Sequence, residues 1–420
     1  MTVSPTSPLR ARVGSPSFVA LVLITGITAL CTDTYIAALP AVGSDLEVSA
    51  STVQLTLTAC VVGMAVGQLV LAPISDAQGR RPFLVASTLV FAVASVVCAV
   101  AGEAWILISA RVVQGVACGL GAAVARAVIS DVSAGRGLAA KFGTLSAVAL
   151  IAPVVGPTIG GFLLAFGDWR TIFWFLSAAG IAVTAAAVVG LPETLTADRR
   201  QPGGVRQQVH RTKDLLLDRA VVVPLAVQSI AVGGFFVYIG GSSFVLQQGV
   251  GLSPYEYAAV FAVNALTMML SSVLYRILVV RTGPLALRRV AIIVQTSATA
   301  VLFFASLLAH PYPPVTLIVI CLALMTAGLG TFLPASASLV QGAGRRFGGT
   351  TSALVGGVPL LTGAVFTPLT GFLGAESVRA MASATFTLFA AAAVLAVWQR
   401  KAVVDITDDP PASAQFDSPR

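Results

Sequence analysis

Asp33 and Arg111 are the charged side chains that lie well inside long apolar stretches of this 420-residue chain. A charge at the middle of a transmembrane helix costs on the order of 2.5 to 3.5 kcal/mol on the insertion scale. A charged residue at such a position therefore indicates a pairing partner, a water-filled cavity or a functional role. Asp33 lies seven residues before Pro40, about 10 Å inside that end of its segment at 1.5 Å per helical residue. A carboxyl there can gain and lose a proton when its surroundings alternate.

Arg111 would act as a permanent cation, because a guanidinium keeps its proton. We expect it to attract Asp33 while the site is empty and to release it when substrate or a proton arrives. Two alternatives stay open. Asp33 can be a structural hydrogen-bond acceptor near the outer headgroups, and Arg111 can extend along its helix to the outer interface.

The composition indicates which elements carry these residues. Hydrophobic residues make up 57% of the chain and charged residues 10%, whereas soluble proteins contain about 25% charged residues. Apolar runs long enough to cross a bilayer as helices recur along the chain. We predict an all-α polytopic membrane protein with twelve transmembrane helices, at residues 18–40, 52–74, 82–101, 105–130, 141–166, 171–191, 221–247, 256–280, 286–309, 314–340, 349–373 and 379–398.

The basic residues predict the orientation of these helices. With a cytoplasmic N-terminus, all of the 25 Lys and Arg residues except Arg111, Arg170 and Arg379 fall at cytoplasmic ends or loops. This dispersal explains the net charge of +8 better than nucleic-acid binding does. We therefore expect a multi-pass protein of the bacterial inner (cytoplasmic) membrane, with both termini in the cytoplasm.

A hydrophilic interruption at 193–219 divides the helices into six and six. The expected organisation is a disordered N-terminus (1–17), an N-terminal six-helix bundle (18–192), a cytoplasmic linker loop (193–219), a C-terminal six-helix bundle (220–399) and a disordered tail (400–420). An offset of 206 residues places FGTLSA on GGTTSA and Pro153 on Pro359. These matches indicate parallel repeats with a cavity between them near the midplane.

The segment APISDAQGRRPF, between the second and third predicted helices, contains Asp76, Gly79, Arg80 and Arg81. Gly79 permits a tight turn, and the two arginines favour the positive side of the membrane. An ordinary cytoplasmic turn would need little more, so that interpretation stays open.

The chain resembles the major facilitator superfamily, and within it the twelve-helix drug:proton antiporters of the Bcr/CflA type. VQLTLTACVVGMAVGQLVLAPISDAQGRRPF, RVVQG, ARAVISD, PVVGPTIGG, DWRTIFWF and LPETL occur in the family's order. The resemblance implies two pseudo-symmetric six-helix bundles and a conformational switch at Asp76, Gly79, Arg80 and Arg81. Ala72, Ala77 and Ser130 depart from the family pattern, which weakens the expected charge network.

The fifth predicted helix contains Pro153, Gly156, Pro157, Gly160 and Gly161. Prolines and glycines at this density favour a kink and close approach of neighbouring helices. In the family, this pattern is associated with exchangers that export solute. A simple small-residue packing face is the alternative.

Polar and aromatic residues inside the central helices are the candidate substrate contacts, although such residues also serve packing between helices. They are Tyr35, Gln54, Gln114, Phe235, Phe236, Tyr238 and Asn264. Their combination suggests an amphipathic organic substrate.

These observations predict proton-coupled efflux of a lipophilic or amphipathic drug or metabolite by alternating access. The alternative within transport is an uptake symporter or facilitator of a small organic solute. A membrane-embedded enzyme is disfavoured, because the chain has only two His residues, His210 and His310, on opposite predicted sides. The expected partners are lipid, protons and a small molecule, without nucleic acid, metal or cofactor, and we expect a monomer.

Overall fold

The computed structural model describes residues 15–132, 148, 155–195, 204–309 and 311–398, and within these ranges it contains helices and no strand. Pro153, His310 and the repeat segment at 142–147 lie outside them, as do the predicted disordered ends apart from residues 15–17 and the linker residues 196–203. The first half contains α1 (Ser15–Ile36), α2 (Leu39–Asp45), α3 (Ala50–Val66), α4 (Ser75–Gln78), α5 (Arg80–Ala99), α6 (Ala104–Val132), the Val155–Phe166 helix and α8 (Arg170–Gly190). The rest comprises α9 (Gly204–Leu217), α10 (Arg219–Phe244), α11 (Pro254–Leu308), α12 (Val315–Ala343), α13 (Gly348–Phe366), α14 (Leu369–Gly374) and α15 (Val378–Trp398).

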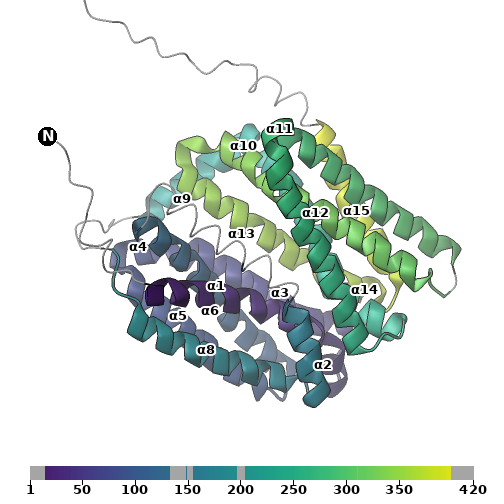
Figure 1. Cartoon of the computed structure of the whole chain (residues 1–420), viewed down its shortest axis with the longest axis horizontal. Coiled ribbons are helices and arrows are strands. Elements are labelled where there is room, and N and C mark those ends of the chain that lie inside the picture. The colour runs from purple at the N-terminus through teal and green to yellow at the C-terminus, as the bar shows by residue number, and fades with distance from the viewer. Residues whose placement is uncertain (1–14, 133–147, 149–154, 196–203, 310, 399–420) are drawn as a thin grey trace, which may run out of the picture.

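Ten stretches of the described chain are helical, long and apolar enough to cross a membrane. One of them, α11, breaks at Gly283, where φ is 74° and ψ is 160°, and its two parts run in different directions in Figure 1. The Val155–Phe166 helix is the described part of the fifth predicted span. This arrangement accommodates all twelve predicted spans and identifies an all-α polytopic membrane protein.

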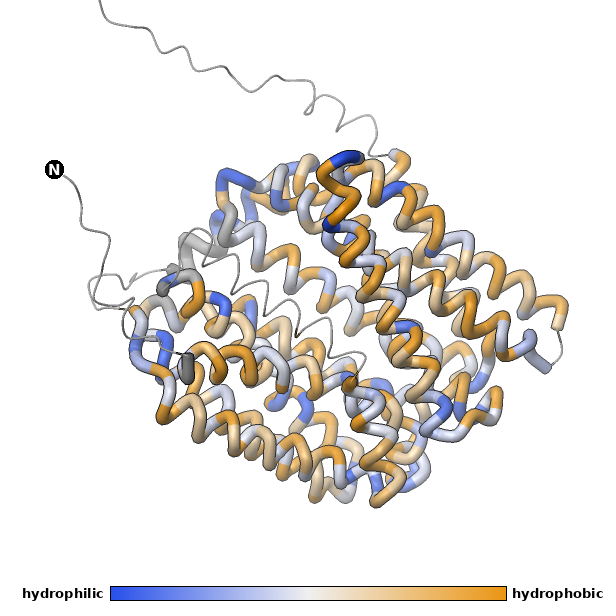
Figure 2. Tube along the Cα trace, viewed as in Figure 1, coloured by the Kyte–Doolittle hydropathy of each residue, from blue (hydrophilic) through white to orange (hydrophobic). Residues whose placement is uncertain are grey.

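Hydrophobic side chains face outward along the helices, as a lipid environment requires. Val189 is 89% exposed, Val280 87% and Val394 71%. Figure 2 shows hydrophobic residues along the lengths of the helices and hydrophilic ones gathered toward their ends. Helices satisfy their own backbone hydrogen bonds, which hydrocarbon cannot do for them, so this fold suits a bilayer.

The helices form two groups that lie side by side in Figure 1, one of α1 to α8 and one of α10 to α15. We call these groups the N half and the C half. The linker between them contains a helix, α9, where the sequence suggested a loop. Leu215 of α9 is fully buried against Val221, Leu225, Val340 and Leu354, so apolar burial attaches α9 to the C half.

Equivalent turns in the two halves depend on glycine. Gly79, before α5, has φ 110° and ψ 156°, and Gly283 has φ 74° and ψ 160°. A Cβ disfavours these positive φ angles, whereas glycine adopts them without steric cost. The matching backbone geometry is consistent with the predicted repeat.

Four glycines bring α3 and α6 into backbone contact. Gly63 of α3 and Gly67, directly after α3, face the backbone of Val112 and Val116, and Gly115 and Gly119 of α6 face Cys60 and Met64. A Cβ at any of the four would collide with a backbone atom of the opposite helix. Small residues four apart on both helices allow this close packing, which fixes α6 and thereby positions Arg111.

Gly119→Ala should lower the apparent melting temperature of the protein in lipid nanodiscs. The added methyl group would collide with the backbone of Met64, and overpacking of this kind costs about 1 to 3 kcal/mol. Gly342→Ala is the matched control, because Gly342 lies in α12 with no atom within 4 Å of its virtual Cβ. Equal melting temperatures for the two variants would contradict the backbone-contact interpretation.

Candidate functional site

A cavity of about 160 Å³ lies between the two halves. Side chains of α1 and α3 form one wall, and side chains of α10 to α13 form the other. Most are apolar or aromatic, with a few polar groups among them, as is usual for small-molecule sites. The lining residues are Thr32, Asp33, Ile36, Leu57, Val61, Met64, Phe235, Phe236, Tyr238, Ile239, Phe261, Asn264, Ala265, Met268, Thr326 and Leu360.

Asp33 is the one carboxylate among these lining residues. Its Oδ1 accepts a hydrogen bond from the Thr32 hydroxyl at 3.2 Å. On its other side, Gly156 packs so closely that a Cβ there would collide with the Asp33 Cβ. The carboxylate therefore belongs to the cavity wall, and the glycine-rich fifth helix packs directly against it.

Arg111 lies elsewhere, fully buried inside the N half. Its Nη1 donates to the Cys31 carbonyl oxygen at 3.1 Å and to Gln114 Oε1 at 2.6 Å. Its guanidinium carbon is 4.7 Å from the centroid of the Tyr35 ring. Among the described residues, the expected ion pair between Arg111 and Asp33 is not formed, and Arg111 does not extend to the outer interface either.

Tyr35 and Gln114 belong to the same buried cluster and do not reach the cavity. Gln114 donates to Ser95 Oγ at 2.7 Å, and the Tyr35 hydroxyl is 2.8 Å from Thr56 Oγ1. Both side chains have their polar groups engaged within the N half. The structure therefore places these two predicted substrate contacts away from the cavity.

Phe235, Phe236, Tyr238 and Asn264 do meet at the cavity. Asn264 Nδ2 donates to the Tyr238 hydroxyl at 2.9 Å. The sequence did not single out Phe261, which stacks on Tyr238 with ring centroids 6.0 Å apart and an interplanar angle of 13°. Phe261 lies three residues before Asn264, about one helical turn, and that spacing was the signal available for it.

Gln54, another predicted substrate contact, instead joins the two halves. Its Nε2 donates to the Gly240 carbonyl oxygen at 3.0 Å, and its Oε1 accepts from the Gly371 backbone N–H at 3.0 Å. Nearby, Gln247 Nε2 donates to the Ala37 carbonyl oxygen at 3.1 Å. These bonds hold the halves together at the end of the molecule that carries α2 and α14.

Gln54→Leu should weaken this closure. Leucine keeps much of the volume but removes both bonds to the C half, and each neutral hydrogen bond contributes about 1 kcal/mol. We expect spin labels at Ser44→Cys and Ser377→Cys to show a larger population of long distances by pulsed electron paramagnetic resonance. Gln228→Leu is the control, because Gln228 donates to the Val355 carbonyl oxygen of its own half. An unchanged distance distribution in Gln54→Leu would rule out its closing role.

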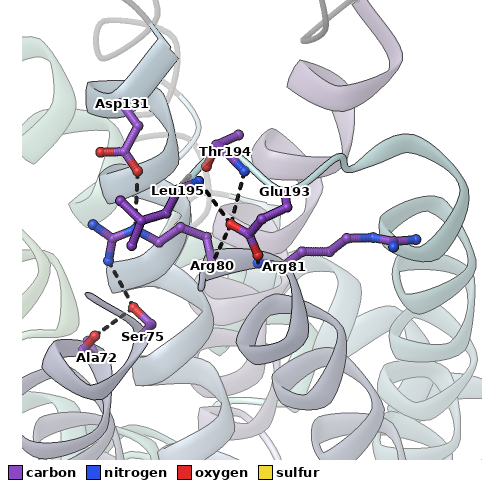
Figure 3. A network of polar contacts seen from close by, with 8 residues as sticks. All are labelled: Ala72, Ser75, Arg80, Arg81, Asp131, Glu193, Thr194 and Leu195. Carbon is purple, nitrogen blue, oxygen red and sulfur yellow. Dashed lines mark hydrogen bonds and ion pairs between the residues drawn. The ribbon is translucent and has the colours of Figure 1, made fainter. Parts of the chain in front are cut away.

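The predicted switch residues form part of a polar network at the opposite end of the N half (Figure 3). Arg80 Nε lies 3.1 Å from Asp131 Oδ2 of α6, and its Nη1 donates to Ser75 Oγ at 2.9 Å. Arg81 Nη2 donates to the Val188 carbonyl oxygen at 2.9 Å. The side chain of Asp76 is outside what the structure describes.

Glu193, from the LPETL segment, completes this network without having been predicted as a partner. Its Oε1 accepts from the backbone N–H of Arg80 at 2.9 Å and its Oε2 from that of Arg81 at 3.2 Å, at the first turn of α5. Burial acts to raise the pKa of Glu193, but the backbone N–H groups of Leu195, Arg80, Arg81 and Thr194 outweigh it and lower that pKa. A carboxylate at a helix N-terminus is also favoured by the helix dipole.

Glu193→Gln should destabilise the protein at neutral pH by about 1 kcal/mol, because one carboxylate oxygen becomes an NH₂ group facing a backbone N–H. Since the folded state lowers the pKa of Glu193, its stabilisation is present above the ordinary glutamate value and is lost as the pH falls through the lower one. The difference in melting temperature between native protein and variant should therefore hold from pH 7 to about pH 5 and shrink as the pH falls below the ordinary glutamate pKa of 4.5. The exposed Glu47→Gln supplies the control, and a pH-independent difference would contradict this account.

The comparison with protein families agrees with this geometry. A sequence model of the Major Facilitator Superfamily matches residues 21–356. The chain belongs to the major facilitator superfamily. Membership makes the protein a membrane transporter rather than an enzyme, and it confirms the family expected from the sequence motifs.

Individual superfamily members give the same result. The chain is 34% identical to an uncharacterized MFS-type transporter, YdgK, of Bacillus subtilis, over 81% of this chain and 84% of that protein. It is 26% identical to a bicyclomycin resistance protein homolog of Haemophilus influenzae, over 83% and 87% of the two chains. That relative agrees with the resemblance to the Bcr/CflA type. A peptide transporter POT solved with sulfate shares the fold, with a TM-score of 0.75 and 12% identity over 95% of this chain and 98% of that one.

Proposed function

We propose that this major facilitator exports a lipophilic or amphipathic drug or metabolite in exchange for protons. The observation that carries the proposal is the position of Asp33 on the wall of the cavity between the halves. An ionised carboxylate there has the Thr32 hydroxyl as its hydrogen-bond donor, and such weak compensation of a charge is costly in an apolar site. Proton uptake or a polar ligand would offset that cost.

The fifth helix couples this carboxylate to movement of the halves. Gly156 packs on Asp33 and Gly160 on the backbone of Thr34, whereas a Cβ at Gly161 would lie 3.1 Å from Ala258 Cβ of the C half. A helix held between α1 and α11 must shift when the halves rock. Such a shift would change the surroundings of Asp33, which is what alternating protonation requires.

The basic residues support a cytoplasmic location for both termini and for α9. The end closed by Gln54 is then external. Export is further supported by the relative named as a bicyclomycin resistance protein homolog. The membrane potential can help to drive this exchange, since it supplies about 2.3 kcal/mol per charge per 100 mV.

Asp33→Asn should abolish gradient-driven transport while leaving the fold intact, because asparagine keeps the shape of the side chain but cannot carry the proton. Inverted membrane vesicles with an acidic interior would be incubated with a panel of amphipathic compounds. The amount of each compound accumulated inside the vesicles would be measured by mass spectrometry. We expect accumulation to fall at least tenfold, a loss equivalent to about 1.4 kcal/mol. Asp168→Asn makes the same chemical change at an exposed site outside the cavity.

Two results would count against the proposal. Undiminished accumulation in Asp33→Asn would remove Asp33 from proton coupling. Accumulation in right-side-out vesicles that follows the proton inward would indicate uptake rather than export.

A further inference from the structure

Asn264, on the wall of the cavity, has a buried side-chain oxygen without a hydrogen-bond partner among the described residues. The residue is 1% exposed, and its Oδ1 receives no hydrogen bond although its Nδ2 donates to Tyr238. Leaving a buried acceptor unpaired costs about 1 to 3 kcal/mol. An unpaired acceptor at a ligand cavity is therefore a site where a ligand donor would bring a gain.

Tyr238 supplies the hydrogen-bond donor that complements the free acceptor of Asn264. Its hydroxyl oxygen accepts from Asn264 Nδ2 at 2.9 Å, so its own hydrogen remains available to a second acceptor. The pair thus offers one free donor and one free acceptor on neighbouring atoms. Rotating the Asn264 amide by 180° exchanges the roles, because Tyr238 would then donate to Oδ1 and leave Nδ2 as the free donor.

We propose that Asn264 and Tyr238 bind an amide or lactam group of the transported molecule. An amide N–H would donate to Asn264 Oδ1, and the neighbouring amide carbonyl oxygen would accept from the Tyr238 hydroxyl. A planar amide supplies its donor and acceptor from separate atoms, as this pair requires, whereas an ester supplies only acceptors. This inference rests on the proposed function, since it treats the cavity as the substrate site.

The surroundings of the pair fit the remainder of such a molecule. Phe261 stacks on Tyr238, and the Phe235 and Phe236 rings meet edge to face with centroids 6.1 Å apart. This aromatic surface suits a flat apolar body. Asp33 lies on the wall formed by the other half, so a molecule held by Asn264 and Tyr238 would extend across the cavity toward it.

The test compares naphthalene-2-carboxamide with methyl naphthalene-2-carboxylate, which differ in the N–H donor. Binding to the full-length protein in nanodiscs is measured by calorimetry, without a proton gradient. We expect the carboxamide to lose about tenfold in affinity in Asn264→Leu while the ester changes little, because a missing partner for a buried polar group costs about that much. Tyr238→Phe should weaken both compounds, since both present a carbonyl oxygen.

Gln295→Leu is the matched control. Gln295 is a fully buried amide in the second part of α11, beyond the break at Gly283, with both polar atoms unpaired, and it does not line the cavity. It should bind both compounds as the native protein does. Comparing variants with one another cancels the different partitioning of the two compounds into lipid.

The outcomes separate this inference from the proposed function. If the affinity ratio of carboxamide to ester is the same in native protein and Asn264→Leu, amide recognition is overturned while proton-driven export stands. If the native protein binds neither compound, amide recognition is overturned and the cavity loses support as the substrate site. Should Asn264→Leu fail to fold, Tyr238→Phe decides, because unaltered binding of both compounds would also refute the assignment.

Discussion

Close packing of the glycine-rich fifth helix against Asp33 is the constraint on which the rest of the site depends. A Cβ at Gly156 would collide with the Asp33 Cβ, so the fifth helix lies directly against α1 at the acid that lines the cavity. The same helix reaches Ala258 of the C half through Gly161. One helix thus contacts both the acid and the C half. In the proposed mechanism, movement of the halves would change the environment of Asp33.

The separation of Arg111 from Asp33 divides the buried charges into two roles. Arg111 is surrounded by groups of its own half, the Cys31 carbonyl oxygen, Gln114 and the ring of Tyr35. These contacts move with the N half and need not break when the halves rock. Arg111 is therefore bonded inside one half, while Asp33 lines the cavity between the halves.

Much of the architecture followed from the sequence, because twelve apolar runs and a glycine turn require little tertiary information. The site was harder, since a polar residue in an apolar helix does not reveal which neighbour it faces. Asp33 and Tyr35 are two residues apart, so at 100° per residue their side chains point in nearly opposite directions. One reaches the cavity and the other Arg111. Gln54 illustrates a second difficulty for prediction from sequence, because its hydrogen-bond partners are backbone groups 186 and 317 positions away.

The bonds within the halves include charged pairs, whereas those of Gln54 and Gln247 between the halves do not. Charged pairs such as Arg80 with Asp131 and Arg170 with Asp45 join elements of the N half. The bonds made by Gln54 and Gln247 between the halves are neutral and use backbone partners. Neutral hydrogen bonds contribute about 1 kcal/mol each, and those to charged groups about 1.5 to 3. A transporter that must separate its halves in every cycle benefits from weak bonds at the closing end and strong ones inside each moving body.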